Sequence, residues 1–334
     1  MSGRANNFDG LRLIGALLVL FSHQFALTGR HEPRVVGDHS FGNLGVLIFF
    51  AVSGYLVTAS WVRDPHLGRF LLRRGLRLLP GLVVAMWALA PVLAWLRPGE
   101  FSWSGYLLHP WSSQRNDWFA GQPQVILNGS LWTIPIEIKC YLILCLAGWV
   151  ARGQLDKLVA AGGIALLLWY VVGLGGQAGF DRANAGGRLS FVPYFGAFFL
   201  LGAALALWPP LRQRAGWLVT AGVLCLAAGQ HTAALVLILV PLVVMVGTAS
   251  WPVLRDAGRI GDLSYGIYLY AWPVQQLGVW ALGKDRPYLL MLGVSLVGAV
   301  AMGWLSWHLV ERRALALKPR RAPAAAGPAV SAPG

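Results

Sequence analysis

Charged residues are scarce in this chain of 334 residues. Asp, Glu, Lys and Arg make up 12% of the sequence, about half of their usual share in soluble domains. Hydrophobic residues, in contrast, make up 57%. The shortage of charge excludes a soluble globular enzyme, a disordered chain and a coiled coil. Because the apolar runs are long and do not alternate with polar residues, they predict an all-α integral membrane protein.

Acidic residues and cysteines are also few. The chain has 13 Asp and Glu against 27 Lys and Arg, which gives a formal net charge of +14. In a soluble protein this excess would suggest nucleic-acid binding, whereas in a membrane protein basic residues gather in cytoplasmic loops. The position of the basic residues decides between these interpretations. The three cysteines form no metal-binding or redox motif, so we expect no metal site.

A transmembrane helix needs about 20 mostly apolar residues, and ten segments meet or approach that length. They predict a bundle of about ten transmembrane helices, at residues 10–28, 44–62, 78–97, 129–150, 157–174, 190–208, 216–229, 232–250, 264–282 and 287–310. An even number of crossings places both termini on one side of the membrane. We expect residues 1–318 to form one transmembrane domain, and residues 319–334, rich in Ala and Pro, to form a disordered cytoplasmic tail.

The basic residues are distributed unequally between the two sets of connecting segments. Eighteen lie in the set that includes both termini, eight lie in the other set, and Lys139 lies within a span. The positive-inside rule therefore places both termini in the cytoplasm, for a multi-pass protein of the inner membrane. Membrane sidedness explains most of the excess of positive charge, so we expect no nucleic-acid partner. The long non-cytoplasmic segment 98–128, rich in Trp, Ser and Gln, could hold a polar acceptor.

Polar residues inside predicted spans are costly, so they are candidates for function. His23 lies deep in the first span, and Arg12 precedes it by eleven residues, which places both on one helical face about 16 Å apart. Asp9 is close to the same face. Because histidine titrates near neutral pH, His23 could act as a general base toward a hydroxyl or an amine. The alternative is a histidine that is simply hydrogen-bonded inside the bundle.

Glu137 lies in the fourth predicted span, within the segment LWTIPIEIKCY. Thr133, Glu137 and Tyr141 are spaced four residues apart and therefore share a helical face. Counted from the outer end of the span, Glu137 is about 12 Å deep, a depth similar to that of His23, so the two side chains could meet. The alternative is a buried ion pair with Lys139 or an arginine, although Glu137 and Lys139 face different directions on a helix.

Arginines gather where a cytoplasmic segment meets the third predicted span. Arg69, Arg73 and Arg77 fall on one helical face, with Arg74 adjacent to it. They could be ordinary positive-inside anchors, or they could form a clamp for phosphate groups. In the second case a phosphate-rich donor would lie at the cytoplasmic face, with its reactive end reaching about 15 Å inward toward His23.

Further polar residues lie within other spans. Ser53 is followed by a glycine that is typical of close helix approach, and Ser53 itself could line an acyl path. Tyr265 and Tyr268 open the ninth predicted span, either as interface aromatics or as the lining of a polar cavity. Glu311 ends the last span at the cytoplasmic boundary, where anchoring is the expected role.

Together these segments resemble the acyltransferase-3 family, integral-membrane acyltransferases that modify cell-surface glycans. FDGLRLIGALLVLFSH is similar to the family's first helix, in which an Arg and a His eleven residues apart fall on Arg12 and His23. GVLIFFAVSGYLV resembles the second helix, and Arg74 and Arg77 resemble an Arg-x-x-Arg element. SLWTIPIEIKCY and LSYGIYLYAWPV resemble two later blocks. The matches extend in the family's order from residue 8 to about residue 313.

The chain departs from the family's pattern at three positions. Ile138 stands where a second acidic residue is usual, Lys139 stands in place of Gln, and Ala271 stands where the ninth helix often has His. A mechanism that needs the second carboxylate or the second histidine is therefore in doubt for this chain. The stretch after the last predicted span is short, so we expect no hydrolase-like extracytoplasmic domain of the kind that some members carry.

The resemblance implies transfer of an acyl group, most often acetyl, from acyl-CoA in the cytoplasm to a hydroxyl of an extracytoplasmic or lipid-linked carbohydrate. Acetyl-CoA would be a co-substrate and not a permanently bound cofactor. Five residues would hold the donor, with the aspartate orienting an arginine: Asp9, Arg12, Arg73, Arg74 and Arg77.

The remaining candidate residues would serve the transfer itself. His23 would deprotonate the acceptor, and Glu137 would orient His23 or bind the acceptor. Four residues would line the acyl path or the acceptor site: Ser53, Tyr141, Tyr265 and Tyr268. Direct attack on the donor and an acyl relay through His23 or Ser53 are both open at this point.

Two other functions fit intramembrane His and Glu residues. A proton-coupled transporter or exporter of a small polar or acylated substrate would also use them, but the sequence shows no internal repeat and no matched pair of broken helices. A scaffold or glycan-binding protein without catalytic activity is the second alternative. It predicts that His23 and the arginine cluster can be changed without effect.

Overall fold

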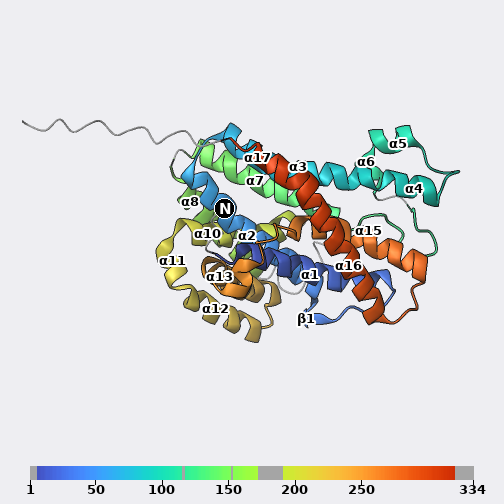
Figure 1. The fold of residues 1–334 in the computed structure, drawn as a ribbon. Helices are drawn as coiled ribbons and strands as arrows, with labels where there is room; N and C mark the ends of the chain where they lie inside the picture. Colours follow the sequence, from blue (N-terminus) through green and yellow to red (C-terminus); the bar gives the residue numbers. More distant parts are fainter. Residues whose placement is uncertain (1–5, 115–116, 152, 172–190, 320–334) are drawn as a thin grey trace, which may run out of the picture.

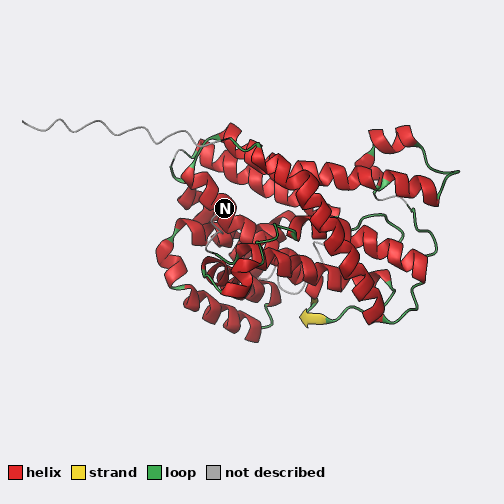
Figure 2. Ribbon diagram, in the orientation of Figure 1, coloured by secondary structure: helices red, strands yellow, loops and turns green. Residues whose placement is uncertain are grey.

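The computed structural model describes residues 6–114, 117–151, 153–171 and 191–319. Nearly all of the regular structure in these residues is helical, and their one sheet is a short hairpin of β1 (Arg34–Val36) and β2 (His39–Ser40) (Figure 2). The predicted all-α class is therefore confirmed. The predicted tail, from residue 320 onward, lies outside the described residues.

Every predicted span coincides with a helix. Residues 172–174, the end of the fifth predicted span, and residue 190, the start of the sixth, lie outside the described residues. By length and composition, six of the described helical segments are long and apolar enough to cross a membrane, and two shorter apolar helices accompany them. The helices at the predicted spans are α1 (Phe8–Leu27), α2 (Phe41–Arg63), α3 (Leu67–Ala88) continued by α4 (Ala90–Leu96), α7 (Ile134–Val150), α8 (Leu155–Val171), α10 (Phe191–Leu207), α12 (Ala215–Ala227), α13 (His231–Thr248), α15 (Ser264–Leu282) and α16 (Tyr288–Ser306).

Short helical elements connect or extend these spans. After α4 come α5 (Trp103–Leu108) and α6 (Pro110–Ser113), and a 3₁₀ turn, η1 (Leu131–Thr133), leads into α7. Two further short helices, α11 (Pro209–Gln213) and α14 (Pro252–Asp256), lie in other connections. After α16 the chain continues through a π-helical turn, η3 (Trp307–Glu311), and then α17 (Arg312–Ala316).

The predicted start of the third span is wrong by eleven residues. α3 begins at Leu67, because the ring of His66 accepts a hydrogen bond from the backbone N–H of Arg69 at 3.3 Å and so caps the helix. The arginine cluster therefore lies within α3 and not in a connecting loop. Arginine is a good helix former. The side chains of Arg73 and Arg77 are only 13% and 16% exposed, so they face the protein interior. A prediction from hydropathy alone excludes such charged residues from a span.

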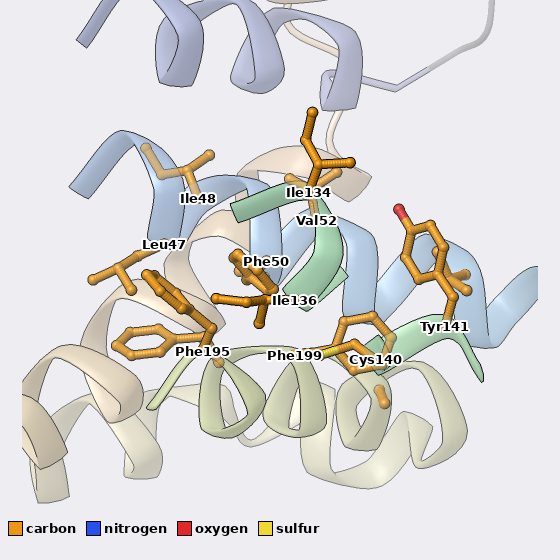
Figure 3. Close-up of a cluster of buried hydrophobic side chains, with 14 of the residues drawn as sticks. Leu47, Ile48, Phe50, Val52, Ile134, Ile136, Cys140, Tyr141, Phe195 and Phe199 are labelled. Carbon is orange, nitrogen blue, oxygen red and sulfur yellow. The ribbon is translucent and has the colours of Figure 1, made fainter. Parts of the chain in front are cut away.

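The main apolar core lies where α2 packs against α7 and α10. Figure 3 shows Phe50 and Phe195 side by side in this core, and Tyr141 at its edge with the hydroxyl directed away from Cys140 and Phe199. α2 and α10 approach closely, since a Cβ on Gly54 would lie 2.0 Å from the carbonyl oxygen of Phe199. The interpretation of the glycine after Ser53 as a helix-packing position is thus supported.

The start of α1 and the end of the last helix lie at the same end of the bundle. Asn7 donates from its side-chain amide to the carbonyl of Val246 at 2.9 Å, and its backbone N–H donates to Gly247. Arg77, halfway along α3, contacts both Asp262, before α15, and Glu311, at the end of η3. In Figure 1 α17 lies beside the start of α3, while α4, α5 and α6 lie at the far end of that helix. This arrangement agrees with an even number of crossings.

Candidate active site

A cavity of about 1290 Å³ enters the bundle from the end that carries α17. It reaches the surface at Arg259, whose side chain is 72% exposed. At its inner end it is lined by Thr133 and Tyr268. All but one of the predicted site residues line it, and the exception is His23.

Cationic side chains dominate the wide part of this cavity. They outnumber its five carboxylates, those of Asp9, Asp64, Glu137, Asp256 and Asp262. The excess of three formal positive charges favours an anionic ligand, and walls of low dielectric strengthen that preference. The eight cationic residues are Arg12, Arg63, Arg73, Arg74, Arg77, Arg255, Arg259 and Lys318.

A shared carboxylate holds two of the predicted donor-binding arginines. Arg77 donates to Asp262 Oδ2 at 2.6 Å, and Arg12 lies 3.7 Å from the same oxygen. Asp9 also contacts Arg12 at 3.4 Å, which agrees with the expectation that Asp9 orients an arginine. Asp262 thereby joins the start of α1 and the middle of α3 to the segment just before α15, with two guanidinium groups at the cavity wall.

Asp64, in the short link between α2 and α3, orders another part of the cluster. Arg73 donates to its Oδ2 at 2.7 Å, and Arg69 donates to its Oδ1 at 2.6 Å. These hydrogen bonds from Arg69 and Arg73 hold the pKa of the Asp64 carboxyl well below its usual range. Only Arg73 of the two arginines lines the cavity.

Arg74 lies against two aromatic rings. Its guanidinium carbon is 5.7 Å from the centre of the Phe70 ring and 6.0 Å from that of Tyr141. It also interacts electrostatically with Glu137. Its Nε is buried and has no hydrogen-bond partner among the described residues, so this donor is available to a ligand.

Ser53, Glu137 and Tyr141 form a hydrogen-bonded cluster below Arg74. The Ser53 hydroxyl donates to Glu137 Oε1 at 2.8 Å and lies 3.2 Å from the Tyr141 hydroxyl. Tyr141 also donates to Glu137 Oε1. The expected shared face of Thr133, Glu137 and Tyr141 is confirmed, since all three line the cavity.

The inner end of the cavity is closed by a second cluster. The hydroxyl of Tyr268 lies 2.5 Å from that of Thr133 and donates to the carbonyl of Ser130 at 2.7 Å. Tyr265, one turn earlier on α15, donates to the carbonyl of Leu78 at 2.8 Å. Both tyrosines line the cavity, so the interpretation as cavity lining is supported over that of interface aromatics.

His23 lies beyond this closed end. Its ring packs edge-on against Trp272, with ring centroids 4.8 Å apart, and Trp272 is one turn along α15 from Tyr268. Trp272 also covers Gly129, where a Cβ would lie 2.6 Å from the indole. His23 Nδ1 has no hydrogen-bond partner among the described residues, so it can form a hydrogen bond with a bound ligand.

The expected meeting of His23 and Glu137 is wrong. No hydrogen bond joins them within the described part of the chain, and Glu137 is engaged by Ser53 and Tyr141 instead. The depth estimate failed because Leu127, Asn128 and Ser130 are already buried before α7 begins. Glu137 is therefore farther from the outer surface than a helix counted from the start of the span would place it.

The packing of α1 against α2 shows how far His23 lies from the cluster of Ser53 and Glu137. Gly42 abuts Ser22 and Gly45 abuts Val19, so the two antiparallel helices place Ser53 near the level of Arg12. His23 is eleven residues farther along α1, which corresponds to about 16 Å. The polar residues thus form a ladder across the bundle, from the arginines through Glu137 and Tyr268 to His23.

Lys139 points away from this ladder. On α7 it precedes Leu142, Ile143 and Leu146, which are exposed large hydrophobic residues and mark the face of the helix turned away from the bundle. The described structure has no ion pair between Lys139 and Glu137, as the helical spacing predicts.

Sequence reasoning missed the acidic partners of the arginines. Asp64, Asp262 and Glu311 each contact at least one arginine of the cluster, and Glu311 is 1% exposed, so its predicted role as a membrane anchor is wrong. The chain has few acidic residues, and these three lie near the ends of predicted spans, as the arginines do. That shared position was the signal in the sequence that could have predicted the ion pairs.

Comparisons with known proteins agree with this geometry. A family model described as an acyltransferase domain matches residues 6–308. The chain is 30% identical to an O-acetyl transferase of Shigella phage Sf6, over 93% of this chain and 96% of the phage protein. It is 29% identical to nodulation protein 10 of Rhizobium leguminosarum bv. viciae, with 95% of each chain covered.

A third relative is longer than this chain. Peptidoglycan O-acetyltransferase OatA of Listeria monocytogenes is 25% identical over 91% of this chain, and the match covers 55% of the Listeria protein. No solved structure is a significant match.

Proposed function

The chain belongs to the acyltransferase-3 family of multi-pass membrane acyltransferases, and from that premise we propose that it moves an acetyl group from cytoplasmic acetyl-CoA to a hydroxyl of an extracytoplasmic or lipid-linked carbohydrate. The observation that carries this proposal is the deep cationic cavity at the end of the bundle that contains both α17 and the start of α1. Family membership also favours acyl transfer over proton-coupled transport.

The rim of the cavity suits the phosphates of coenzyme A. Arginine binds phosphate through paired N–H donors, and Arg12, Arg73, Arg74 and Arg77 all line the cavity. Asp9, Asp64 and Asp262 fix several of these guanidinium groups without neutralising the cluster. We therefore assign the phosphate-bearing end of the donor to this rim and its thioester end to the interior.

His23 is the proposed general base. It would take the proton from the acceptor hydroxyl while the hydroxyl oxygen attacks the thioester carbonyl. The carbon–oxygen bond forms, the carbon–sulfur bond breaks, and coenzyme A leaves as a thiolate that takes up a proton. Thr133, Tyr268 and Trp272 lie between the donor cavity and His23, so the thioester has to pass them to reach the base.

The distance of about 16 Å along α1 between the level of Ser53 and His23 favours direct transfer over a relay in which Ser53 carries the acetyl group. An acetyl ester on Ser53 would lie at the level of Arg12 and far from His23. We propose instead that Ser53 and Tyr141 hold the Glu137 carboxylate in place, where it faces Arg74 and borders the path of the donor's arm.

The acceptor class rests on the relatives. The Listeria relative is named for peptidoglycan, and a carbohydrate hydroxyl is the acceptor that we propose for this chain. In the inner membrane with the arginine rim in the cytoplasm, as the charge distribution predicts, the face that carries α4, α5, α6 and the segment 98–128 would meet that acceptor.

The test uses membranes from cells with and without the protein. Radiolabelled acetyl-CoA is supplied to inverted vesicles, whose cytoplasmic face is outward, and acetylated glycan is recovered and identified by mass spectrometry. We expect label to enter glycan only when the protein is present. Label that remains in acetyl-CoA, with the protein correctly inserted, would contradict the proposal.

A further inference from the structure

Glu311 is a buried carboxylate at the end of the last membrane helix that the proposed chemistry does not use. Glu311 is 1% exposed, and its Oε2 lies 3.5 Å from Nη1 of Arg77. Its other oxygen, Oε1, accepts a hydrogen bond from the Ser306 hydroxyl at 2.8 Å. Both carboxylate oxygens are therefore engaged inside the protein, in a position that an interfacial anchor would leave exposed.

A local change of helix type brings Glu311 to this position. Trp307–Glu311 forms a π-helical turn between the α-helical segments α16 and α17. Such a turn inserts one residue into an α-helix, which shifts the residues after it by about 100° around the axis. The inserted residue turns Glu311 toward α3 and leaves Ser306, five residues earlier, within hydrogen-bond distance.

Two neighbouring helices leave room for the carboxylate. A Cβ on Gly81 of α3 would lie 3.3 Å from Cγ of Glu311, and a Cβ on Gly266 of α15 would lie 3.3 Å from its Oε1. Glycine at both positions lets the Glu311 side chain pass between α3 and α15. A buried charge accommodated in this way contributes little to stability by itself, so a role in ordering its partner is the better explanation.

That partner, Arg77, is fixed from three directions. Asp262 accepts from it at 2.6 Å, Glu311 lies at 3.5 Å, and the Tyr265 ring lies 5.6 Å from its guanidinium carbon. Asp262 also contacts Arg12, so it alone would not restrict Arg77 to one orientation. The second carboxylate sets the plane of the guanidinium, which lines the cavity.

We propose that Glu311 is a positioning residue for the acyl donor, which acts by fixing the Arg77 guanidinium toward the donor's phosphates. This inference rests on the proposed function, because it assigns Arg77 to coenzyme A. It adds the π-helical turn and the end of the last helix to the donor site.

The experiment compares Glu311→Gln with the wild-type protein in nanodiscs and in membranes. The amide keeps the size of the side chain and removes its charge. The dissociation constant of coenzyme A is measured by equilibrium binding, and KM for acetyl-CoA and kcat are measured with the membrane-borne acceptor. We expect the Kd and the KM to rise about tenfold and kcat to stay within about threefold.

Two further variants separate positioning from folding. In a double variant with Arg77→Gln, the second substitution should add no further loss, because both act through one guanidinium. Ser306→Ala removes one hydrogen bond from Glu311 and should raise the Kd by a few-fold, which keeps the proposal testable if Glu311→Gln inserts poorly. Asp285→Asn, in an exposed loop, is the matched control and should leave the Kd unchanged.

The outcomes distinguish failure of the positioning role of Glu311 from failure of the proposed acetyltransferase function. Wild-type protein that binds coenzyme A and acetylates its acceptor, with an unchanged Kd in Glu311→Gln, would overturn the positioning role alone. So would additive losses in the double variant, or a fall in kcat with KM unchanged. Wild-type protein that neither binds coenzyme A nor consumes acetyl-CoA would contradict the proposed function and this inference with it.

Discussion

The Ser53 hydroxyl donates a 2.8 Å hydrogen bond to the Glu137 carboxylate, which joins α2 to α7 inside the donor cavity. Tyr141 donates to the same carboxylate oxygen, so Glu137 is held by two hydroxyl groups and faces Arg74. Glu137 therefore serves the arginine side of the cavity. It is not the partner that orients His23.

Replacing Glu137 by Gln should lower kcat/KM for acetyl-CoA by at least about tenfold, because an amide oxygen is a weaker acceptor for the Ser53 and Tyr141 hydroxyls and the substitution removes the electrostatic partner of Arg74. Lys139→Gln is the control on the same helix, since Lys139 lies outside the cavity, and it should change kcat/KM by less than about twofold. Initial rates in membranes with matched protein amounts check both. Equal effects of the two substitutions would count against this role for Glu137.

Replacing Arg74 by Lys should weaken donor binding although the charge is kept. Lysine lacks the planar guanidinium that lies near the Phe70 and Tyr141 rings, and it lacks the unpaired Nε donor. We expect the Kd of coenzyme A to rise about tenfold. Arg69→Lys is the matched control, because Arg69 pairs with Asp64 and does not line the cavity. A rise in Kd for both variants would point to nonspecific electrostatics.

Replacing Tyr268 by Phe should uncouple donor consumption from acetyl transfer. The substitution removes the hydroxyl contacts with Thr133 and Ser130 that close the inner end of the cavity, so water can then reach the thioester from the side of His23. The Kd of coenzyme A should stay within about twofold, because the arginine rim is untouched. The ratio of acetyl groups transferred to acetyl-CoA consumed should fall. An unchanged ratio, measured by paired assays of glycan label and free thiol, would contradict this role.

Replacing Asp64 by Asn should reduce thermal stability in a way that depends on pH. The folded-state pKa of Asp64 is lowered by its bonds to Arg69 and Arg73, whereas an unfolded Asp titrates near about 3.9. The stabilisation by the ionised carboxylate is therefore fully present above about pH 4 and is lost as the pH falls through the folded pKa. The difference in Tm between wild type and variant should be constant from neutral pH to about pH 5 and shrink below pH 4. No difference at neutral pH would contradict the ion-pair role.

Much of the fold could be predicted from the sequence because the membrane imposes long apolar segments. Hydropathy finds a span wherever about 20 residues avoid charge, and α15 (Ser264–Leu282) matches its predicted bounds. The same reasoning places the start of α3 too late, because Arg73 and Arg77 face a polar cavity and not lipid. Apolar counting cannot distinguish an arginine that ends a span from one that lines a cavity within it.

The composition of the site was easier to predict than its geometry. Helical spacing correctly groups Glu137 and Tyr141 on α7, and Thr133, in the 3₁₀ turn just before α7, lines the same cavity. The relation between Glu137 and His23 depends on where each helix lies along the membrane normal, and the buried non-helical residues before α7 change that. The contact of Arg77 with Glu311, 234 positions apart, depends on a π-helical turn that no periodicity reveals.

The central claim is that His23 is the general base that receives the acceptor on the far side of the Tyr268 and Trp272 barrier. The most direct measurement compares His23→Ala with His31→Ala, a substitution in an exposed loop, for acetylation of glycan and for the Kd of coenzyme A. The account predicts that His23→Ala lowers acetylation by at least about a hundredfold and leaves the Kd within about twofold, while His31→Ala changes neither. Near-wild-type acetylation by correctly inserted His23→Ala, or a loss of coenzyme A binding in the same variant, would contradict it.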